Sequence, residues 1–317
     1  MKRTLHDQIA ANKRASVFLG VMLVLLLAAL GAAIGGVYAP DVWWAGGALA
    51  AGVGLIGVLV AWTSGPDILL SISGARPATQ LEDQMLDNVC EEMALAAGIP
   101  KPKLYVIEDS APNAFATGKD PEHGVICFTT GLIQKLDRDE LQGVMAHEMS
   151  HIRNYDIKFM SVIAVTAGLI PLIADLFGRS LWYGGGRRSS RDNDNSNMIF
   201  IVLAIALSIL APIFAKLLEM SVSRQREYLA DTSAAELTRY PEGLASALLK
   251  ISADPEPLEA ANRATQHMYI VNPLRGAERM AAMFSTHPPI QERVRRLRTL
   301  MGAGGGDDGS SIIDHRS

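Results

Sequence analysis

The residues best suited to chemistry are the two histidines and the glutamate of HEMSH, residues 147–151. On an α-helix, residues four apart lie above one another on one face, so His147 and His151 can offer two imidazole nitrogens to one metal ion. Glu148 lies one step round the helix, beside such a metal and not bound to it. Its carboxylate can therefore act on a metal-bound water, which is the arrangement that metal-assisted hydrolysis requires.

This motif is a weak signal when it stands alone. It specifies only three residues, and about one chain of this length in a hundred would carry it by chance. A helical pair of histidines can also be two solvated surface residues. Other parts of the chain therefore have to decide between a metal site and a surface helix.

The stretch around the motif, residues 137–156, is predicted to be helical. Asp137 is suited to cap the first turn, and Glu140, three residues later, completes a capping-box pattern. Apolar residues recur at helical spacing at positions 141, 144, 145 and 149. Gly143 is the one weak point of this helix.

A third metal ligand is predicted in the segment SRQREYLAD, residues 223–231. Glu227 and Asp231 are four apart and share a helix face, and a catalytic zinc with two histidines takes a carboxylate as its third protein ligand. We expect Glu227 to be this ligand and Asp231 to accept a hydrogen bond from a ligand imidazole. The alternative is a solvated charged helix, and Glu219 and Glu236 are the next candidates for the ligand.

Composition indicates a membrane protein with a water-soluble part. The chain has 317 residues, of which 49% are hydrophobic and 20% charged, and its mean hydropathy is +0.18. A net charge of −4 gives no indication of nucleic-acid binding. Cys90 and Cys127 are the only cysteines. They form no disulfide framework and lack the spacing of zinc ligands, so we interpret them as reduced thiols.

Two uncharged runs near the N-terminus are long enough to span a bilayer. Residues 15–39 and 42–64 carry no charge and are separated by Pro40 and Asp41. The alternatives are a secretory signal, whose apolar region would be shorter, and a buried core hairpin. Tryptophans near the ends of the second run fit the interfacial belt, and the basic N-terminus predicts that both ends of the hairpin face the cytoplasm.

A second pair of apolar runs, residues 159–174 and 198–215, is only marginally long enough to cross. These runs can span the bilayer or form a re-entrant or interfacial hairpin. The loop at 178–197 carries four arginines, which disfavours its translocation. The two flanking uncharged runs favour translocation, because runs of this length can cross a slightly thinned bilayer, and we expect a second transmembrane hairpin. Two spans or none both return the chain to the side it left, so SRQREYLAD is expected on the same side as HEMSH.

The smaller elements predict the fold class, which is a mainly α membrane protein with transmembrane helices and an α+β catalytic domain that contains a small sheet. We expect a linker at 66–80, a helix at 81–98, strands at 103–107 and 124–129, and helices around 245–251 and 294–301. The expected organisation is a cytoplasmic N-terminus (1–14), a transmembrane hairpin (15–65), a first half of the catalytic domain (66–156), a second apolar hairpin (157–218), a second half of the domain (219–301) and a disordered tail (302–317).

Four motifs together resemble one family. NAFA (113–116), HEMSH (147–151), SRQREYLAD (223–231) and HPP-x-x-x-R (287–293) occur in this order, with two apolar segments before HEMSH and two after it. This pattern is similar to that of the HtpX family of membrane-integrated zinc metalloproteases, which are of the gluzincin type and related to the CAAX prenyl proteases. The resemblance covers about residues 1 to 300.

The resemblance implies a role for each matched residue. The metal ligands would be His147, His151 and Glu227, which would hold one Zn²⁺ per chain, and Glu148 would be the general base. His287 and Arg293 would lie near the cleft as further catalytic residues, with His287 or Tyr228 helping to hold the oxyanion. The residues on an edge strand that takes the substrate backbone would be Asn113, Ala114 and Phe115.

The resemblance also implies a cellular role. The family performs quality control of misfolded or damaged membrane proteins, in stress responses, with its active site on the cytoplasmic side of the bacterial inner membrane. Its partners would be the lipid bilayer and unfolded membrane proteins. Two alternatives remain: a protease with its motif inside the bilayer, which the charges around the motif disfavour, and a non-catalytic zinc-stabilised scaffold, which would not need Glu148. The sequence indicates neither the cleavage preference nor the oligomeric state.

Overall fold

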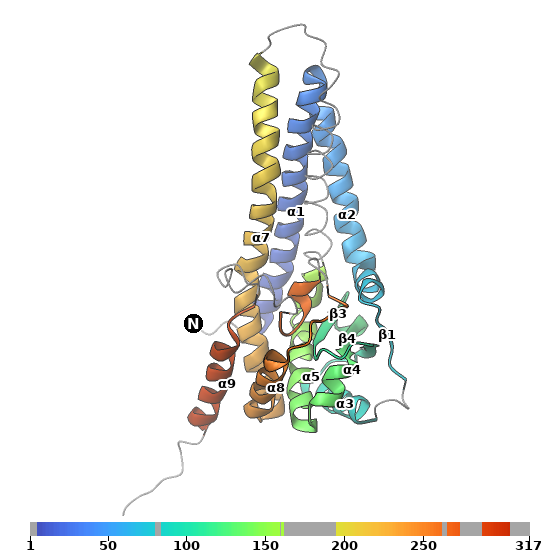
Figure 1. The fold of residues 1–317 in the computed structure, drawn as a ribbon, viewed down its shortest axis with the longest axis vertical. Helices are drawn as coiled ribbons and strands as arrows, with labels where there is room; N and C mark the ends of the chain where they lie inside the picture. The colour runs from blue at the N-terminus through green and yellow to red at the C-terminus, as the bar shows by residue number, and fades with distance from the viewer. Residues whose placement is uncertain are drawn as a thin grey trace, which may run out of the picture.

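The structure is a computed structural model, and it describes residues 5–79, 84–158, 160–161, 195–261, 265–272 and 287–304. Three long helices stand side by side and a globular part lies at one end of them (Figure 1). The long helices are α1 (Leu5–Tyr38), α2 (Trp43–Ile72) and α7 (Asn195–Thr238). A short 3-10 turn, Pro40–Val42, joins α1 to α2.

The first two helices form a hairpin at the position of the two uncharged runs. Gly20–Tyr38 and Pro40–Ile72 are each long and apolar enough to cross a bilayer, with mean hydropathies of 2.4 and 1.9. Helix α2 continues through Pro66 to Ile72, so the linker expected to begin at residue 66 is helical in its first part. Proline costs a helix one backbone hydrogen bond, a loss that neighbouring helices make tolerable in membrane-spanning segments.

Small residues allow α1 and α2 to approach closely. A Cβ atom on Gly46 would overlap the backbone of Gly31 and Gly35, which is the close backbone contact typical of membrane helices. Helix α7 packs on the other side of α1, where Phe200 covers Gly36 and its ring lies 6.5 Å from that of Trp43.

Large apolar side chains cover the outer faces of α2 and α7. In a water-soluble protein so many exposed aliphatic residues on adjacent helices would be an aggregation hazard, whereas lipid solvates them. This surface therefore agrees with the membrane-spanning interpretation of both helices. The most exposed of these residues include Leu49, Leu55, Ile56, Ile199, Val202 and Ile209.

The globular part contains a four-stranded sheet in the order β1-β2-β4-β3. Strand β1 (Arg76–Pro77) is antiparallel to β2 (Lys103–Ile107), β2 is parallel to β4 (Gly124–Thr129), and β4 is antiparallel to β3 (Ala114–Gly118). The strands predicted at 103–107 and 124–129 have these bounds in the structure. Strand β3, which holds most of NAFA, lies at an edge of the sheet.

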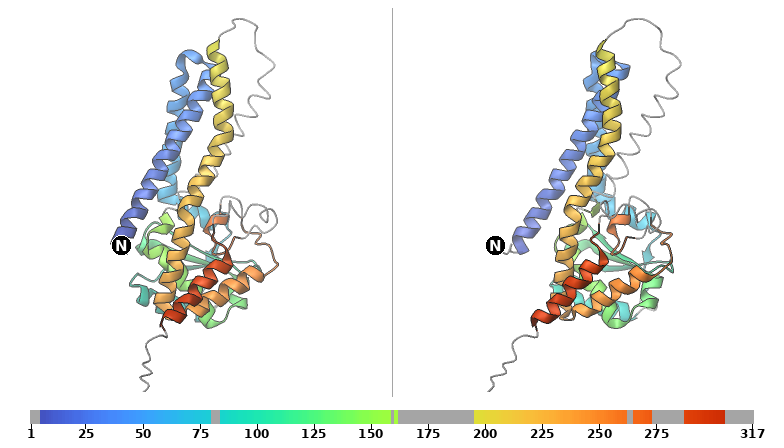
Figure 2. Two further views of the ribbon diagram at one scale, coloured as in Figure 1. Left: turned by 90° about the vertical axis from the view of Figure 1, so that its left-hand side faces the viewer. Right: turned by 60° about the vertical axis from the view of Figure 1, so that its left-hand side comes forward.

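Helices pack around this sheet and enclose α5, which carries HEMSH (Figure 2). The helix predicted at 81–98 is α3, described from residue 84, and it ends before Gly98, whose φ of 67° is the left-handed conformation typical of a helix stop. The other helices are α4 (Thr130–Lys135), α5 (Arg138–Arg153), α8 (Pro241–Ala253), α9 (Ile290–Gly304) and the 3-10 turns Pro121–His123 and Gln266–Met268.

Helix α5 begins as predicted, with a complete capping box. The Asp137 carboxylate accepts a hydrogen bond from the Glu140 backbone, and the Glu140 side chain accepts one from the Asp137 N–H. The apolar residues at 141, 144, 145 and 149 are fully buried in the main core. Gly143 proves to be a packing contact and not only a weak point, because a Cβ there would lie 2.5 Å from the backbone nitrogen of Leu244 on α8.

The apolar run at 159–174 and the arginine-containing loop after it lie largely outside the described residues. Whether this run crosses the bilayer and the loop is translocated therefore stays a prediction. The run at 198–215 is part of α7. Helix α9 continues to Gly304, so the first residues of the expected C-terminal tail are helical, and residues 305–317 are not described.

Candidate active site

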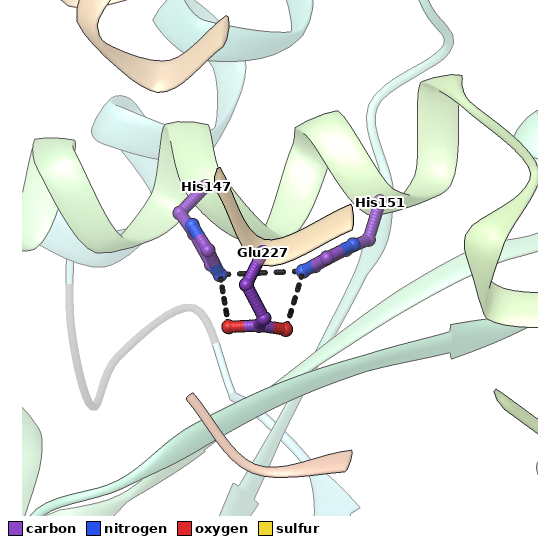
Figure 3. A group of neighbouring side chains, drawn as sticks. All are labelled: His147, His151 and Glu227. Atoms are coloured by element: carbon purple, nitrogen blue, oxygen red, sulfur yellow. Dashed lines mark hydrogen bonds and ion pairs between the residues drawn. The ribbon is translucent and has the colours of Figure 1, made fainter. Parts of the chain in front are cut away.

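The two histidines of α5 and a glutamate of α7 meet in the interior of the globular part (Figure 3). The Nε2 atoms of His147 and His151 are 3.2 Å apart. Glu227 places Oε2 3.8 Å from the first nitrogen and Oε1 3.6 Å from the second. All three residues are buried, and their ligand atoms lie within 4.8 Å of one another. The structure thus brings together the three predicted ligands, two of which are far from the third in sequence.

Each histidine is oriented by a carboxylate on the opposite side of its ring. His147 Nδ1 lies 3.0 Å from Asp231 Oδ1, and His151 Nδ1 lies 3.1 Å from Asp156 Oδ2. A carboxylate only accepts hydrogen bonds, so each Nδ1 is the protonated nitrogen and each Nε2 points its lone pair to the centre. Asp231 therefore has the position predicted for it.

This centre fits a divalent metal ion. Two nitrogens and two carboxylate oxygens converge there, and these acceptors repel one another unless a cation lies between them. Tetrahedral ligands about 2.1 Å from zinc are roughly 3.4 Å apart, which is close to the separations seen here. Burial favours the neutral form of His151, but the carboxylates of Asp156 and Glu227 favour the charged form more strongly and raise its pKa to about 9.

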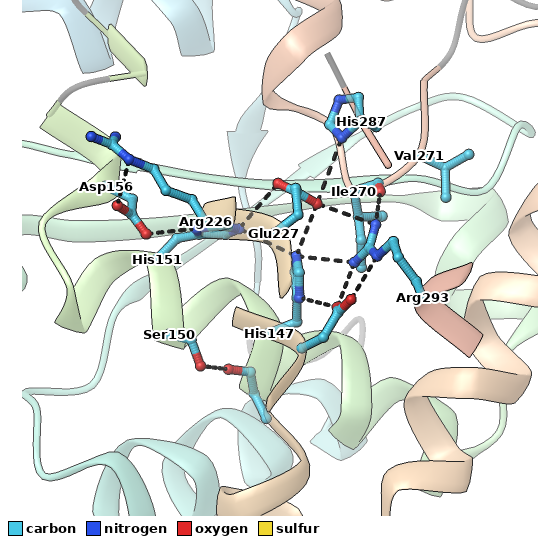
Figure 4. A network of polar contacts seen from close by, with 12 residues as sticks. His147, Ser150, His151, Asp156, Arg226, Glu227, Ile270, Val271, His287 and Arg293 are labelled. Carbon is cyan, nitrogen blue, oxygen red and sulfur yellow. Dashed lines mark hydrogen bonds and ion pairs between the residues drawn. The ribbon is translucent and has the colours of Figure 1, made fainter. Parts of the chain in front are cut away.

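Arg293, from α9, connects the ligands to the rest of the site (Figure 4). Its guanidinium is fully buried and donates two hydrogen bonds to Asp231, from Nη2 to Oδ1 at 2.7 Å and from Nε to Oδ2 at 2.8 Å. Nη1 lies 3.2 Å from Glu227 Oε2 and donates to the Ile270 carbonyl. Burial opposes ionisation of Glu227, but Arg293 and His287 hold the pKa of its carboxyl well below the usual range.

His287 also faces this carboxylate, with Nδ1 3.6 Å from Glu227 Oε2. The two residues of HPP-x-x-x-R expected near the cleft therefore lie beside the metal ligands. Tyr228, the other residue considered for holding the oxyanion, has its ring 3.7 Å from the guanidinium carbon of Arg296 and packs there instead.

Glu148 lies next to the ligands on α5 and is almost fully buried. Among the described residues its Oε1 has no hydrogen-bond partner, and the backbone of Ala116 on β3 lies close enough to favour the ionised carboxylate. Burial, together with the negative charge of Glu227, raises the pKa of Glu148 to about 7, against the opposing charges of His151 and Arg293. A buried carboxylate with a spare oxygen and a pKa near neutrality is suited to exchange protons with water.

The predicted substrate-binding residues lie at the start of the edge strand, with Asn113 just before it, and another part of the chain contacts them. The Ala114 carbonyl accepts a hydrogen bond from Ile270 N–H at 2.9 Å, and Asn113 Nδ2 donates to the Val271 carbonyl at 2.9 Å. Phe115 is buried edge-on against Tyr269. The residues are therefore beside the site, and Ala116, further along β3, lies next to the Glu148 carboxylate.

Asp156 and Arg226 are site residues that sequence reasoning missed. Asp156 is fully buried, binds His151 and has Oδ1 3.5 Å from Arg226 Nε. The signal was a carboxylate five residues after the second histidine. One helical turn does not bring such a residue to the ring, but Tyr155 adopts a left-handed φ of 61° that ends the regular course of α5 just before Asp156.

Comparisons with known proteins agree with this geometry. The model of Peptidase family M48 matches residues 80–301. Proteins described as Protease HtpX homolog are similar over most of the chain: one from Caldanaerobacter subterraneus subsp. tengcongensis is 46% identical over 94% of this chain and 99% of its own length. Another from Dictyoglomus thermophilum is 51% identical over 76% of this chain and 77% of its own length.

A solved structure shares the fold. The crystal structure of S. mikatae Ste24p has a TM-score of 0.50 and 22% identity, covering 92% of this chain, and this chain spans 65% of the length of that longer one. A long family match, close relatives along nearly the whole chain and a buried His-His-Glu cluster beside a glutamate lead to one assignment. The chain belongs to peptidase family M48, within which it is an HtpX-type, membrane-integrated metallopeptidase.

Proposed function

We propose that this protein is a zinc-dependent endopeptidase that cleaves unfolded or damaged membrane proteins next to the bilayer, on the cytoplasmic side of a bacterial inner membrane. The observation that carries the proposal is the buried cluster of His147, His151 and Glu227 with Glu148 at its side. One zinc ion per chain fits this cluster, and the HtpX-type relatives support a proteolytic use of it.

The roles of the chain's own residues follow from their positions. A bound metal ion supplies the positive charge that acidifies water and polarises a peptide carbonyl. Glu148 accepts the proton of the attacking water and passes it to the leaving amine. His287 lies beside the ligand carboxylate, where it can donate a hydrogen bond to the developing oxyanion. Arg293 holds Asp231 and Glu227 in place, which fixes His147.

The substrate is held as an extended chain along the edge of the sheet. Strand addition gives affinity through backbone hydrogen bonds that do not depend on side chains, as a protease of unfolded chains requires. Ile270 and Val271 already contact Asn113 and Ala114. We therefore place the new pairing on the rest of β3, next to Ala116 and the Glu148 carboxylate.

The surroundings of the site support cleavage outside the bilayer. The surface of the globular part carries exposed ion pairs such as Arg138 with Glu92 and Arg298 with Glu242. Such charges are expensive at membrane depth, so an intramembrane protease fits less well. A zinc-stabilised scaffold would not need the buried, spare carboxylate oxygen of Glu148.

The decisive experiment is Glu148→Gln in the purified protein, with unfolded casein as substrate. We expect the variant to bind zinc at one equivalent per chain and to lose proteolysis by at least a hundredfold, as loss of a general base costs. Asp139→Asn, an exposed change on the same helix, is the control and should retain activity. Near-normal cleavage by Glu148→Gln would overturn the proposal.

A further inference from the structure

Helix α7, Asn195–Thr238, carries both a long apolar stretch and the predicted metal ligand Glu227 in one continuous helix. Its apolar part begins at Met198, and Glu227 lies 29 residues later. A helix advances ~1.5 Å per residue, so the number of residues between the end of the apolar stretch and Glu227 sets the distance of the active site from the bilayer.

The end of the apolar part can be located on each long helix. The first charged residues on the side of the globular part are Arg14 on α1, Asp67 on α2 and Lys216 on α7. On α7 the apolar stretch from residue 198 to 215 is about 27 Å long, close to the ~30 Å hydrocarbon core of a bilayer. At the end remote from the globular part, Phe200 of α7 packs against Trp43 of α2. The apolar stretches of these two helices therefore have that end at a similar depth in the bilayer.

The distance from this boundary to the metal ligand follows from the sequence. Glu227 is eleven residues beyond Lys216, which is about 16 Å along the helix and about 15 Å after a typical tilt of 20°. The described helix is unbroken through this stretch, so the two positions cannot approach each other without breaking it.

A separate part of the chain gives a consistent height. Lys158 lies seven residues after the ligand His151, and its ammonium is 5.1 Å from the ring centre of Trp62 on α2. A lysine and a tryptophan in contact at the end of an apolar helix are typical of the membrane interface. A chain of seven residues covers between about 10 Å as a helix and about 23 Å when extended, and this range includes 15 Å.

We propose that this metallopeptidase cuts membrane proteins only at bonds that lie about five or more residues outside their own membrane segment. An extended chain advances ~3.3 Å per residue, so five residues are needed to reach a site about 15 Å from the apolar boundary. The inference rests on the proposed proteolytic function. The substrate class is therefore a membrane protein with an extended, unfolded segment on the side of the globular part. Peptide bonds at the very end of a membrane helix are not cleaved, because they do not reach the site.

The test uses designed substrates in liposomes that contain the full-length protein. Each substrate has one apolar helix, a Gly/Ser spacer of 0, 2, 4, 6, 8 or 12 residues, and a segment that the enzyme cleaves in casein. We expect the initial rate to fall at least tenfold for spacers shorter than four residues and to level off above six. Mass spectrometry should place every cut at least four residues from the last apolar residue.

Two controls separate this inference from the proposed function. The same cleavable segment and spacers without the apolar helix should be cut at one rate for all spacer lengths, and Glu148→Gln should cut none of the substrates. Failure to cut the soluble series would contradict the proteolytic function itself. Rapid cutting within two residues of the apolar helix, with the soluble series cut normally, would overturn the height inference alone.

Discussion

Among the single residues of the site, each histidine contacts a carboxylate, and each of these carboxylates contacts an arginine. Asp231 and Asp156 hold the two histidines, and Arg293 and Arg226 lie against these two carboxylates in turn. Such outer contacts fix the ring orientation and raise the basicity of the ligand nitrogen. The metal affinity should therefore depend on residues that never touch the metal.

Replacing Asp156 with Asn should lower the zinc affinity about 10–100-fold, because the amide holds the His151 ring less firmly and does not bring its negative charge. Asp231→Asn should have an effect of similar size. Competition with a chelator of known affinity measures both, and the exposed Asp139→Asn serves as the control. An unchanged affinity in Asp156→Asn would mean that this carboxylate only supports the turn after α5.

Activity should fall on the acidic side of neutrality because of Glu148. Burial raises the pKa of this carboxyl to about 7, and a carboxylic acid is protonated below its pKa, so the fraction able to accept a proton decreases as the pH falls. The positive charge of bound metal lowers the pKa, so the acidic limb of kcat/KM should lie at about 7 or below. A limb well above pH 7 would assign it to another group.

At the scale of elements, helix α5 is positioned by a close crossing with α8. A Cβ on Gly143 would meet the backbone of Leu244, and one on Gly243 would meet the Asp139 carbonyl. The two helices therefore touch backbone to backbone next to the turn that carries His147. A residue that weakens the helix in isolation permits the contact that fixes it.

Gly143→Ala should destabilise the protein by about 1–3 kcal/mol, because backbone atoms cannot move aside as a flexible side chain can. Better intrinsic helix propensity would instead favour alanine by at most about 1 kcal/mol. Thermal unfolding in detergent measures the sign, and the neighbouring Gln142→Ala is the control. A stabilised Gly143→Ala protein would show that α8 yields easily.

For the molecule as a whole, the globular part that contains α5 and α9 lies at one end of the three long helices (Figure 1). We propose that this side is the cytoplasm, because the basic N-terminus and the Asp41 turn differ in charge as the positive-inside rule requires. Which side the site faces decides which loops of a membrane protein can reach it.

Cysteine labelling in intact cells tests this orientation. A cysteine at position 41, in the exposed turn between α1 and α2, should react with a membrane-impermeant reagent, and one at position 252 on α8 should react only after permeabilisation. Cys90 and Cys127 are buried, and burial raises the pKa of the Cys90 thiol to about 12, so the native thiols should not react with the reagent in the folded protein. Labelling at 252 in intact cells would reverse the topology.

The features that depend on local spacing could be predicted from the amino-acid sequence alone. The membrane hairpin, the capped α5 helix and the face shared by His147 and His151 follow from periods that a helix imposes within a few residues. The strands at 103–107 and 124–129 were likewise predicted from local composition. Glu227 could be chosen because zinc chemistry requires a third ligand near two histidines and SRQREYLAD offered a carboxylate.

The contacts between distant segments could be seen only in the folded protein. Packing of α7 and α9 on α5 brings Glu227, Asp231 and Arg293 to the histidines. The left-handed turn at Tyr155 carries Asp156 to His151, and Ile270 takes the Ala114 carbonyl on the edge strand. No local pattern predicts such contacts, because their energy comes from burying groups that are far apart in the chain.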